Sequence, residues 1–441
     1  MLFCTPHLLE DGFIYARYLR NALGGLGLVF NVGEHVNALT SPLYSYVLLA
    51  LSWAMHGQIL LAERILFVVF LCGTCCLAET LVAWSSMLLC TCVYFYGLIG
   101  METTMFLFFI LLTILLLEKE RYDWLPIVLV LLALSRMEGA AMTPVVAWIC
   151  YRRNRWPRWV AFLPAFAVIA VYLAANHHLY GSMMPASSSA KIGQGKSGFW
   201  GKWPRAFLYG YRLDPIGRPA FWAFIPQMLA IPLALRRLRG TTWNAAAVPF
   251  FIILFSFYVL LNIPNYGWYY APLILLVSMT ATAEFTATRA GAVLLAVLVV
   301  AQGVSAIRML CAVRGDRETP YSAAAAWLNV NAPKDATVES LEIGEFGWLL
   351  DRYLYDSLGL TLPKNADHIA HRDFDSWLEE DKPDYVLYHT TRPFPFERII
   401  VRDPNYAPLD YNRLDIVIYK RIHDIGPRGS EMLPKSSLRA K

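Results

Sequence analysis

The chain has 441 residues, of which 57% are hydrophobic and only 16% are charged. A water-soluble protein of this composition would expose large apolar patches, so an ordinary soluble fold is excluded and lipid is expected to cover much of the surface. The formal net charge of +5 is small for this length, and the basic residues stand in short clusters between apolar runs. Nucleic-acid binding is therefore not expected.

Apolar runs of roughly 18 to 22 residues continue to about residue 312, and each is long enough to cross the hydrocarbon layer. They predict a polytopic α-helical membrane domain over residues 1–312, with candidate spans at 62–81, 83–99, 102–117, 159–176, 219–235, 243–262, 268–285 and 291–311. The stretch 124–150 is too long for one straight span and is interrupted by Arg136, Glu138 and Gly139. It predicts two short helices or a re-entrant hairpin broken at this polar point, which makes about ten membrane helices.

Four basic clusters set the predicted orientation, because cytoplasmic loops of membrane proteins are enriched in Lys and Arg. The clusters are Lys119 with Arg121; Arg152, Arg153, Arg155 and Arg158; Arg236, Arg237 and Arg239; and Arg289. With all four in the cytoplasm, the segments expected on the outer face are 1–61, the break at Arg136, 177–218, 262–267 and everything after Arg314.

This threading has two consequences near the N-terminus. Residues 41–57 begin and end outside, so they are expected to lie in the membrane interface as bent amphipathic helices within the first outer loop, 1–61. Residues 1–9 start outside and are too short to span, so a first membrane helix is expected to be missing, through truncation or a misplaced start codon.

The part of the chain after the last span predicts a small extracytoplasmic α/β domain over residues 313–425, followed by a disordered tail, 426–441. Its expected elements are a helix at 320–330, a strand at 336–341, a helical turn after Gly344, a strand at 353–356, a helix at 372–380 and strands at 385–389 and 414–419. The domain has no Gly-rich phosphate loop and no nucleophile elbow. We therefore expect no independent catalytic site in it, and acceptor binding is our hypothesis for its role.

Two adjacent carboxylates, Glu10 and Asp11, stand at the start of the first outer loop. A carboxylate at a membrane surface is a candidate general base. Acidic residues are also favoured at a solvated helix N-terminus by the helix dipole, so the pair alone decides nothing.

Ten short motifs along the chain, taken in order, resemble those of bacterial GT-C membrane glycosyltransferases, particularly the branch with the arabinofuranosyltransferases of mycobacterial cell walls. They are EDGFI (10–14), RYLRNAL (17–23), GLGLVFNVGE (25–34), TSPLY (40–44), GMETTMF (100–106), SRMEG (135–139), YGSMMPASSSAK (180–191), GWYYAP (267–272), EIGEFGW (342–348) and DSLGLTLP (356–363). The joint order of these motifs is more specific than any one of them. The chain departs from the family where Glu10 replaces the first of two aspartates and PASSSAK replaces PNTFYAK.

The resemblance implies a bacterial plasma-membrane glycosyltransferase that moves a sugar from a polyprenyl-phosphate donor to an envelope glycan, lipid or protein. An outer-loop carboxylate would act as the general base, and we favour Asp11 over Glu10. Other residues expected to bind the donor phosphate or the substrate are Arg17, Arg20, Glu102, Arg136, Glu138, Lys191, Trp268, Tyr269 and Tyr270. No nucleotide donor and no metal cofactor are predicted, although adjacent acids could hold a divalent cation.

Several of these residues also have plainer explanations. Glu102 could cap a helix, Arg136 and Glu138 could form an ion pair that satisfies the broken backbone, and Trp268 with its neighbours could belong to an interfacial aromatic belt. The competing functional classes are a transporter or flippase of envelope lipids and a noncatalytic membrane scaffold. The sequence shows no internal repeat, and charged residues do not recur at the centres of several spans. Both features would be expected of a transporter, so this class is disfavoured.

Overall fold

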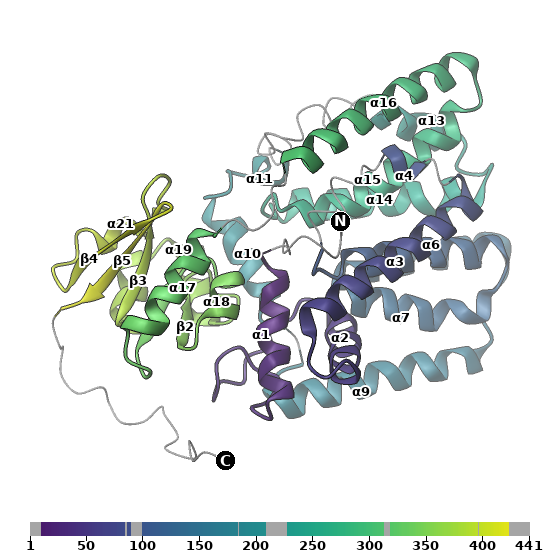
Figure 1. The fold of residues 1–441 in the computed structure, drawn as a ribbon. Helices are drawn as coiled ribbons and strands as arrows, with labels where there is room; N and C mark the ends of the chain where they lie inside the picture. Colours follow the sequence, from purple (N-terminus) through teal and green to yellow (C-terminus); the bar gives the residue numbers. More distant parts are fainter. Residues whose placement is uncertain are drawn as a thin grey trace.

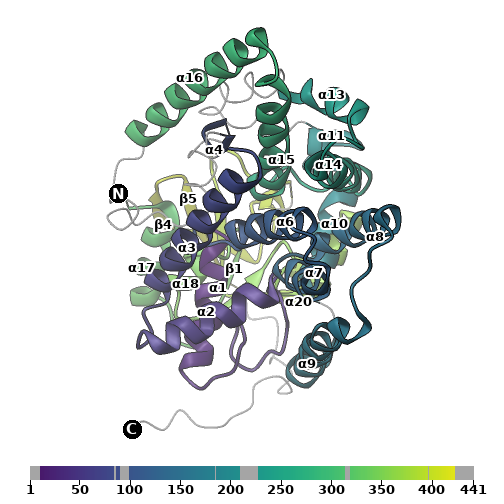
Figure 2. The ribbon, with the colours of Figure 1, turned by 90° about the vertical axis from the view of Figure 1, so that its right-hand side faces the viewer.

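The computed structural model describes residues 10–83, 86–89, 99–183, 185–208, 227–312, 318–395 and 397–422. The described part consists of a helical body and a smaller C-terminal domain that contains a sheet, with α1 (Gly12–Leu23) at the junction between them (Figure 1). Figure 2 shows the helices of the body from their far ends, with α16 (Arg289–Ala312) at the rim. The predicted tail 426–441 lies outside the described residues.

Among the described residues, three helices of the body are long and apolar enough to cross a membrane: α3 (Ile59–Leu81), Trp159–Tyr180 with α9 (Phe162–Tyr180), and α14 (Thr242–Leu260). Besides α16, the body also contains α2 (Pro42–Ala54), α4 (Ser86–Leu89), α6 (Thr103–Glu118), α7 (Leu125–Ser135), α8 (Met142–Arg153), α10 (Ser187–Ser197), α11 (Arg205–Leu208), α13 (Ala230–Arg236) and α15 (Gly267–Phe285). Nearly every residue of α15 is buried, which makes it the central helix of the body. The total of about ten spans stays a prediction, since 83–99 and the first part of 219–235 lie largely outside the described residues.

The interruption predicted inside 124–150 is confirmed. Helix α7 ends at Ser135, Arg136 is extended, and a 3-10 turn (Met137–Ala141) leads into α8. Gly139 lies so close to the preceding helix that a Cβ atom there would come 2.6 Å from the carbonyl oxygen of Leu132. The segment 41–57 forms α2, one 13-residue helix capped by Ser41, and its predicted place in the interface stays a prediction.

The C-terminal domain is a five-stranded mixed sheet in the order β2-β1-β3-β5-β4. Strand β1 pairs in parallel with β2 and β3, whereas β5 pairs antiparallel with β3 and β4. The strands and helices are α17 (Pro320–Asn331), β1 (Thr337–Ser340), α18 (Glu345–Leu349), β2 (Tyr353–Asp356), α19 (Pro363–His371), α20 (Phe374–Asp381), β3 (Tyr385–His389), α21 (Glu397–Ile400), β4 (Tyr406–Arg413) and β5 (Ile416–Arg421). All seven predicted elements are present, but the prediction missed α19, α21 and β4.

Arg17, predicted to bind donor phosphate, instead docks the C-terminal domain on the first loop. Its side chain is 4% exposed and donates to the carbonyl oxygens of Phe30, Gly347 and Arg352 at 2.9, 2.6 and 3.0 Å. A fourth bond reaches the side chain of Asn31, which also pairs with the backbone of β2. These contacts use most of the donors of the guanidinium, so little remains for a ligand.

Arg20 and Glu10 extend the same contact. Arg20 donates to the carbonyl oxygen of Trp348 at 2.6 Å, with its guanidinium 5.0 Å from the indole ring. The carboxylate of Glu10 accepts from the backbone N–H groups of Gly344 and Glu345, at 2.8 and 3.0 Å, where α18 begins. A Cβ atom on Gly344 would lie 1.9 Å from the carbonyl oxygen of Glu10, so only glycine fits there.

Replacing Arg17 with methionine should destabilise the protein strongly, because three buried carbonyl oxygens would lose a charged donor. We expect Arg17→Met to lower the free energy of unfolding by roughly 3 kcal/mol or more, seen as a lower melting temperature of the detergent-solubilised protein. Arg158→Met is the control, because Arg158 forms an exposed pair with Asp123 and should contribute little. Equal melting temperatures for both variants would contradict the docking role of Arg17.

On strand β1 of the sheet, Glu339 is fully buried near two other acids. One of its carboxyl oxygens accepts from the Ser357 hydroxyl at 2.7 Å, and the other has no hydrogen-bond partner among the described residues. Burial, together with the charges of Asp381 and Asp356, raises the pKa of Glu339 well above its ordinary value. The folded protein therefore holds a proton on Glu339 that the unfolded chain releases near pH 4.5.

The folded-state pKa of Glu339 is raised, so protonated Glu339 makes its full contribution to the free energy of unfolding at low pH. That contribution is lost progressively as the pH rises above about 4.5. Glu339→Gln keeps the shape and carries no proton to lose. Its free energy of unfolding should match wild type near pH 4.5 and exceed it increasingly toward pH 8, by at most about 1.4 kcal/mol per pH unit. The melting temperature measured across this range should rise above that of wild type in parallel. Glu379→Gln, at an exposed position of the same domain, should show no such trend. A constant difference for Glu339→Gln across this range would refute the buried proton.

Candidate functional site

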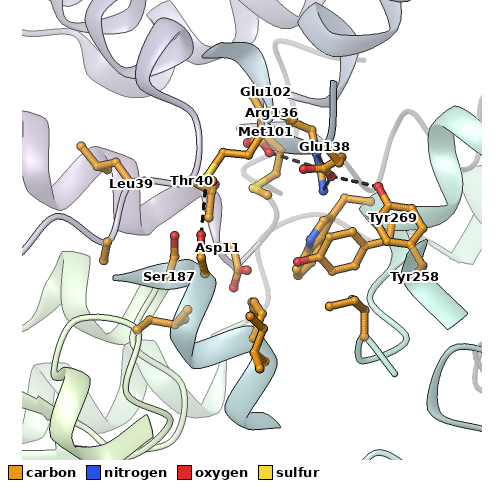
Figure 3. A pocket seen from close by; sticks show the side chains of 18 of the residues that line it. Asp11, Leu39, Thr40, Met101, Glu102, Arg136, Glu138, Ser187, Tyr258 and Tyr269 are labelled. Carbon is orange, nitrogen blue, oxygen red and sulfur yellow. Dashed lines mark hydrogen bonds and ion pairs between the residues drawn. The ribbon is translucent and has the colours of Figure 1, made fainter. Parts of the chain in front are cut away.

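One cavity of about 490 Å³ brings together residues from widely separated motifs (Figure 3). Its walls come from the start of α1, the N-terminal ends of α6 and α15, the break after α7, α10 and the C-terminal end of α14. The C-terminal domain contributes Leu360, from the loop after β2. Seven of the predicted site residues line this cavity: Asp11, Glu102, Arg136, Glu138, Lys191, Trp268 and Tyr269.

Asp11 is held at the cavity by a close backbone contact. It immediately precedes α1, and a Cβ atom on the next residue, Gly12, would lie only 3.1 Å from backbone atoms of Gly100. This approach brings the start of α1 against the turn that leads into Glu102. Burial raises the pKa of Asp11, and the nearby positive charge of Lys191 opposes that rise.

Arg136 is the centre of an ion-pair network on the cavity wall. Its guanidinium lies 2.6 Å from a carboxyl oxygen of Glu138 and 3.4 Å from one of Glu102. The Tyr258 hydroxyl donates to Glu138 at 2.9 Å, and the Tyr15 hydroxyl donates to Glu102 at 3.1 Å. Nη1 of Arg136 is buried and is the nitrogen that pairs with Glu102, without a hydrogen bond among the described residues. The network thus places on the cavity wall a guanidinium that is paired with two carboxylates.

Lys191 supplies a second cation from another direction. Its ammonium lies 4.1 Å from the ring centre of Tyr266 and 5.8 Å from that of Trp268. Burial lowers the pKa of Lys191, whereas the negative charge of Asp11 raises it. Helix α10, which carries Lys191, is held by two glycines: a Cβ atom on Gly193 or Gly195 would come 2.8 Å from neighbouring carbonyl oxygens.

The other four predicted residues do not line the cavity. Glu10, Arg17 and Arg20 dock the C-terminal domain, as described above. Tyr270 stacks on Phe207 with ring centres 4.5 Å apart, and its hydroxyl donates to the Phe207 carbonyl oxygen. Their predicted contact with the donor has no support in this geometry, because their polar atoms are used between parts of the protein.

Sequence reasoning missed several residues of the cavity. Tyr15 follows Asp11 by one helical turn, so it could have been predicted to share the site with Asp11. Tyr258 lies near the C-terminal end of α14, on the same side of the helical body as the start of α15, and could have been predicted in the same way. Ser187 lines the cavity from the altered PASSSAK motif. Glu342, in the C-terminal domain, does not line the cavity, but it lies close enough to Asp11 that burial and this charge raise the pKa of Glu342.

The described residues contain no group of three or more His, Cys, Asp or Glu side chains placed to hold a metal ion. Asp11 and its neighbour Glu10 do not converge on a common point, because the carboxylate of Glu10 is bound to the start of α18.

Comparisons with known proteins find one domain family and a distant structural similarity. Residues 307–429 match a family model described as a domain of unknown function, DUF8728. No curated protein matches the sequence. Among solved structures, the chain is similar to the arabinofuranosyltransferase AftD from Mycobacteria, with 12% identity and a TM-score of 0.39, over 95% of this chain and 38% of that one. The chain thus spans about two fifths of the length of AftD, and the likeness is too distant to define an activity.

Removing the charge of Arg136 should destabilise the helical body, because the carboxylates of Glu102, which is buried, and Glu138, which is half-buried, would be left without a cation. We expect Arg136→Gln to cost about 3–5 kcal/mol, measured as a lower melting temperature. Adding Glu138→Gln to this variant should restore part of the loss. If the single variant melts like wild type, the network does not stabilise the break in 124–150.

Proposed function

We propose that the chain is a membrane glycosyltransferase that moves a sugar from a polyprenyl-phosphate donor to an acceptor of the cell envelope. The observation that supports this most directly is the cavity itself. Residues of five separate motifs, at Asp11, Glu102, Arg136, Lys191 and Trp268, converge there although up to 257 positions separate them. Its volume of about 490 Å³ lies within the range of about 300–1,000 Å³ found for small-molecule sites.

In the proposed reaction, Asp11 is the general base. Its carboxylate removes the proton from an acceptor hydroxyl as the oxygen attacks the anomeric carbon of the donor sugar. A new bond forms between carbon and acceptor oxygen, and the bond between that carbon and the phosphate oxygen breaks. Polyprenyl phosphate leaves with the bonding electron pair, and the configuration of the anomeric carbon inverts.

The leaving phosphate needs positive partners, and the cavity offers two. Arg136, whose guanidinium is paired with Glu102 and Glu138, and Lys191 line the same cavity as Asp11. Hydrogen bonds from cations to phosphate are about twice as strong as neutral ones, and their value increases as charge develops on the leaving group. We assign phosphate binding to these two residues and no longer to Arg17 and Arg20.

The remaining cavity residues have supporting roles in this proposal. Trp268 and Tyr269 present aromatic surface to a sugar ring. Glu102 and Glu138 orient the guanidinium of Arg136 from two sides. We propose that the cavity and the C-terminal domain lie on the extracytoplasmic face of a bacterial plasma membrane, in keeping with the basic clusters at the other ends of the helices.

The test is transfer of radiolabelled sugar from a panel of polyprenyl-phosphate donors into membrane lipid or polysaccharide. Asp11→Asn should lower the rate by about 10²–10⁴-fold, the usual contribution of a general base. Glu10→Gln should have a much smaller effect on the rate, because Glu10 does not line the cavity. Both variants should insert into the membrane. Asp11→Asn should melt close to wild type, whereas Glu10→Gln should melt lower, because Gln keeps only one of the two oxygens that accept from the start of α18.

Asp123→Asn, at a partly exposed acid outside the cavity, is the matched control and should retain full activity. Retention of activity by Asp11→Asn together with its loss in Glu10→Gln would move the base to Glu10. If wild type transfers sugar from none of the donors, the glycosyltransferase proposal is wrong, and a scaffold or a transporter becomes the better hypothesis.

A further inference from the structure

A second, larger cavity of about 1360 Å³ lies at the opposite ends of the same helices. Its walls come from the C-terminal ends of α3, α6 and α15, the N-terminal end of α14 and the residues after α13. Helix α14 begins at this cavity and ends at the candidate active site, so its 19 residues separate the two by about 28 Å. That distance is close to the thickness of a bilayer's hydrocarbon core, about 30 Å, which puts the second cavity at the level of lipid headgroups.

Three exposed arginines line the second cavity: Arg236, Arg237 and Arg239. Arg237 is fixed by Glu284, with their side-chain atoms 3.1 Å apart, and Asn244 donates to the other oxygen of Glu284 at 2.9 Å. Arg236 and Arg239 form no ion pair within the described ranges of the chain. Arg236 and Arg239 therefore line the cavity without an ion pair, and the three arginines of its lining outnumber its two carboxylates, Glu118 and Glu284.

Asn244 adds a hydrogen-bond acceptor, whereas the arginines of the cavity are donors. The side chain is 3% exposed, and because its amide nitrogen donates to Glu284, its oxygen Oδ1 points elsewhere. That oxygen is buried and has no hydrogen-bond partner among the residues described here. A buried acceptor left unpaired costs free energy, so the cavity suits a ligand that brings a hydroxyl donor beside its negative charge.

Apolar surface adjoins this polar cavity. On and beside α13, Leu229, Leu233 and Leu235 are 60%, 41% and 40% exposed, and Leu235 lines the cavity directly. Exposed leucines are ordinary on a lipid-facing helix, but these leucines directly precede the arginines of the cavity in the sequence. A free phosphate would use only the polar part of the surface, whereas a phospholipid would use both.

We propose that this cavity binds the headgroup of an anionic phospholipid that carries a hydroxyl. Arg236 and Arg239 contact the phosphodiester oxygens, Asn244 accepts from the headgroup hydroxyl, and the acyl chains lie along the leucines of α13. Anionic lipids are drawn to basic groups at a membrane surface by about 1 kcal/mol per residue, and a concave site adds selectivity to this attraction. The proposal does not depend on the catalytic role of the other cavity.

The experiment measures binding of phosphatidylglycerol and of phosphatidylcholine to the purified full chain in detergent by native mass spectrometry. Wild type should prefer phosphatidylglycerol. Arg236→Gln with Arg239→Gln should weaken that binding about thirtyfold, from two contacts of about 1 kcal/mol each, without changing the binding of phosphatidylcholine. Asn244→Leu should weaken phosphatidylglycerol more than phosphatidic acid, which lacks the hydroxyl.

The matched control removes two exposed arginines outside the cavity, Arg152→Gln with Arg289→Gln, and should retain the preference. A similar loss in the control pair would mean attraction to positive charge in general and would overturn the proposal. So would competition by inorganic phosphate at millimolar concentration, because the site would then recognise a free anion. Lysine at positions 236 and 239 keeps the charge, so Arg236→Lys with Arg239→Lys should retain most of the binding.

Discussion

Arg17 joins segments that lie more than 300 positions apart, because its buried guanidinium donates to carbonyl oxygens at Phe30, Gly347 and Arg352. A buried charge that loses such partners is strongly penalised, so the first loop and α18 separate only at high cost. Asp11 immediately precedes the helix that carries Arg17. The docking of the C-terminal domain therefore also fixes the candidate base, and the loop after β2 reaches the cavity with Leu360.

The break at Arg136 shows why a structural and a functional role need not exclude each other. An interrupted helix leaves backbone groups and a cation in the body of the protein, which is tolerated only where polar partners surround them. Glu138 and Glu102 provide these partners, and Tyr258 and Tyr15 complete them. Since Arg136, Glu102 and Glu138 also line the cavity, the network that satisfies the break is at the same time part of the candidate site.

Patterns in the sequence predicted those parts of the fold that depend on local physics. Bilayer thickness fixes span length, so α14 was predicted within two residues of its ends, and period-two patterns gave β1, β2, β3 and β5. Strand β4 was missed because Pro408 stands at a register shift within it, and proline ordinarily argues against a strand. Residue types alone carried no distances between segments, so the arginines of the first loop were assigned to phosphate rather than to the carbonyl oxygens of α18. For the same reason, the sequence could not explain Gly344 of the EIGEFGW motif. Glycine is required there because the backbone of Glu10 lies against it.

Asp11 and Lys191 influence each other's protonation, and this coupling bears on the proposed reaction. Burial raises the pKa of Asp11, while the charge of Lys191 lowers it toward the ionised form that a base requires. A donor phosphate beside Lys191 would neutralise part of that charge, so the pKa of Asp11 would rise again when both substrates are present. A base whose pKa approaches the working pH accepts a proton most effectively. In the proposed reaction, the charge of Lys191 thus favours the carboxylate form of Asp11 in the free protein, and donor binding would make that carboxylate more basic at the stage when the acceptor hydroxyl must lose its proton.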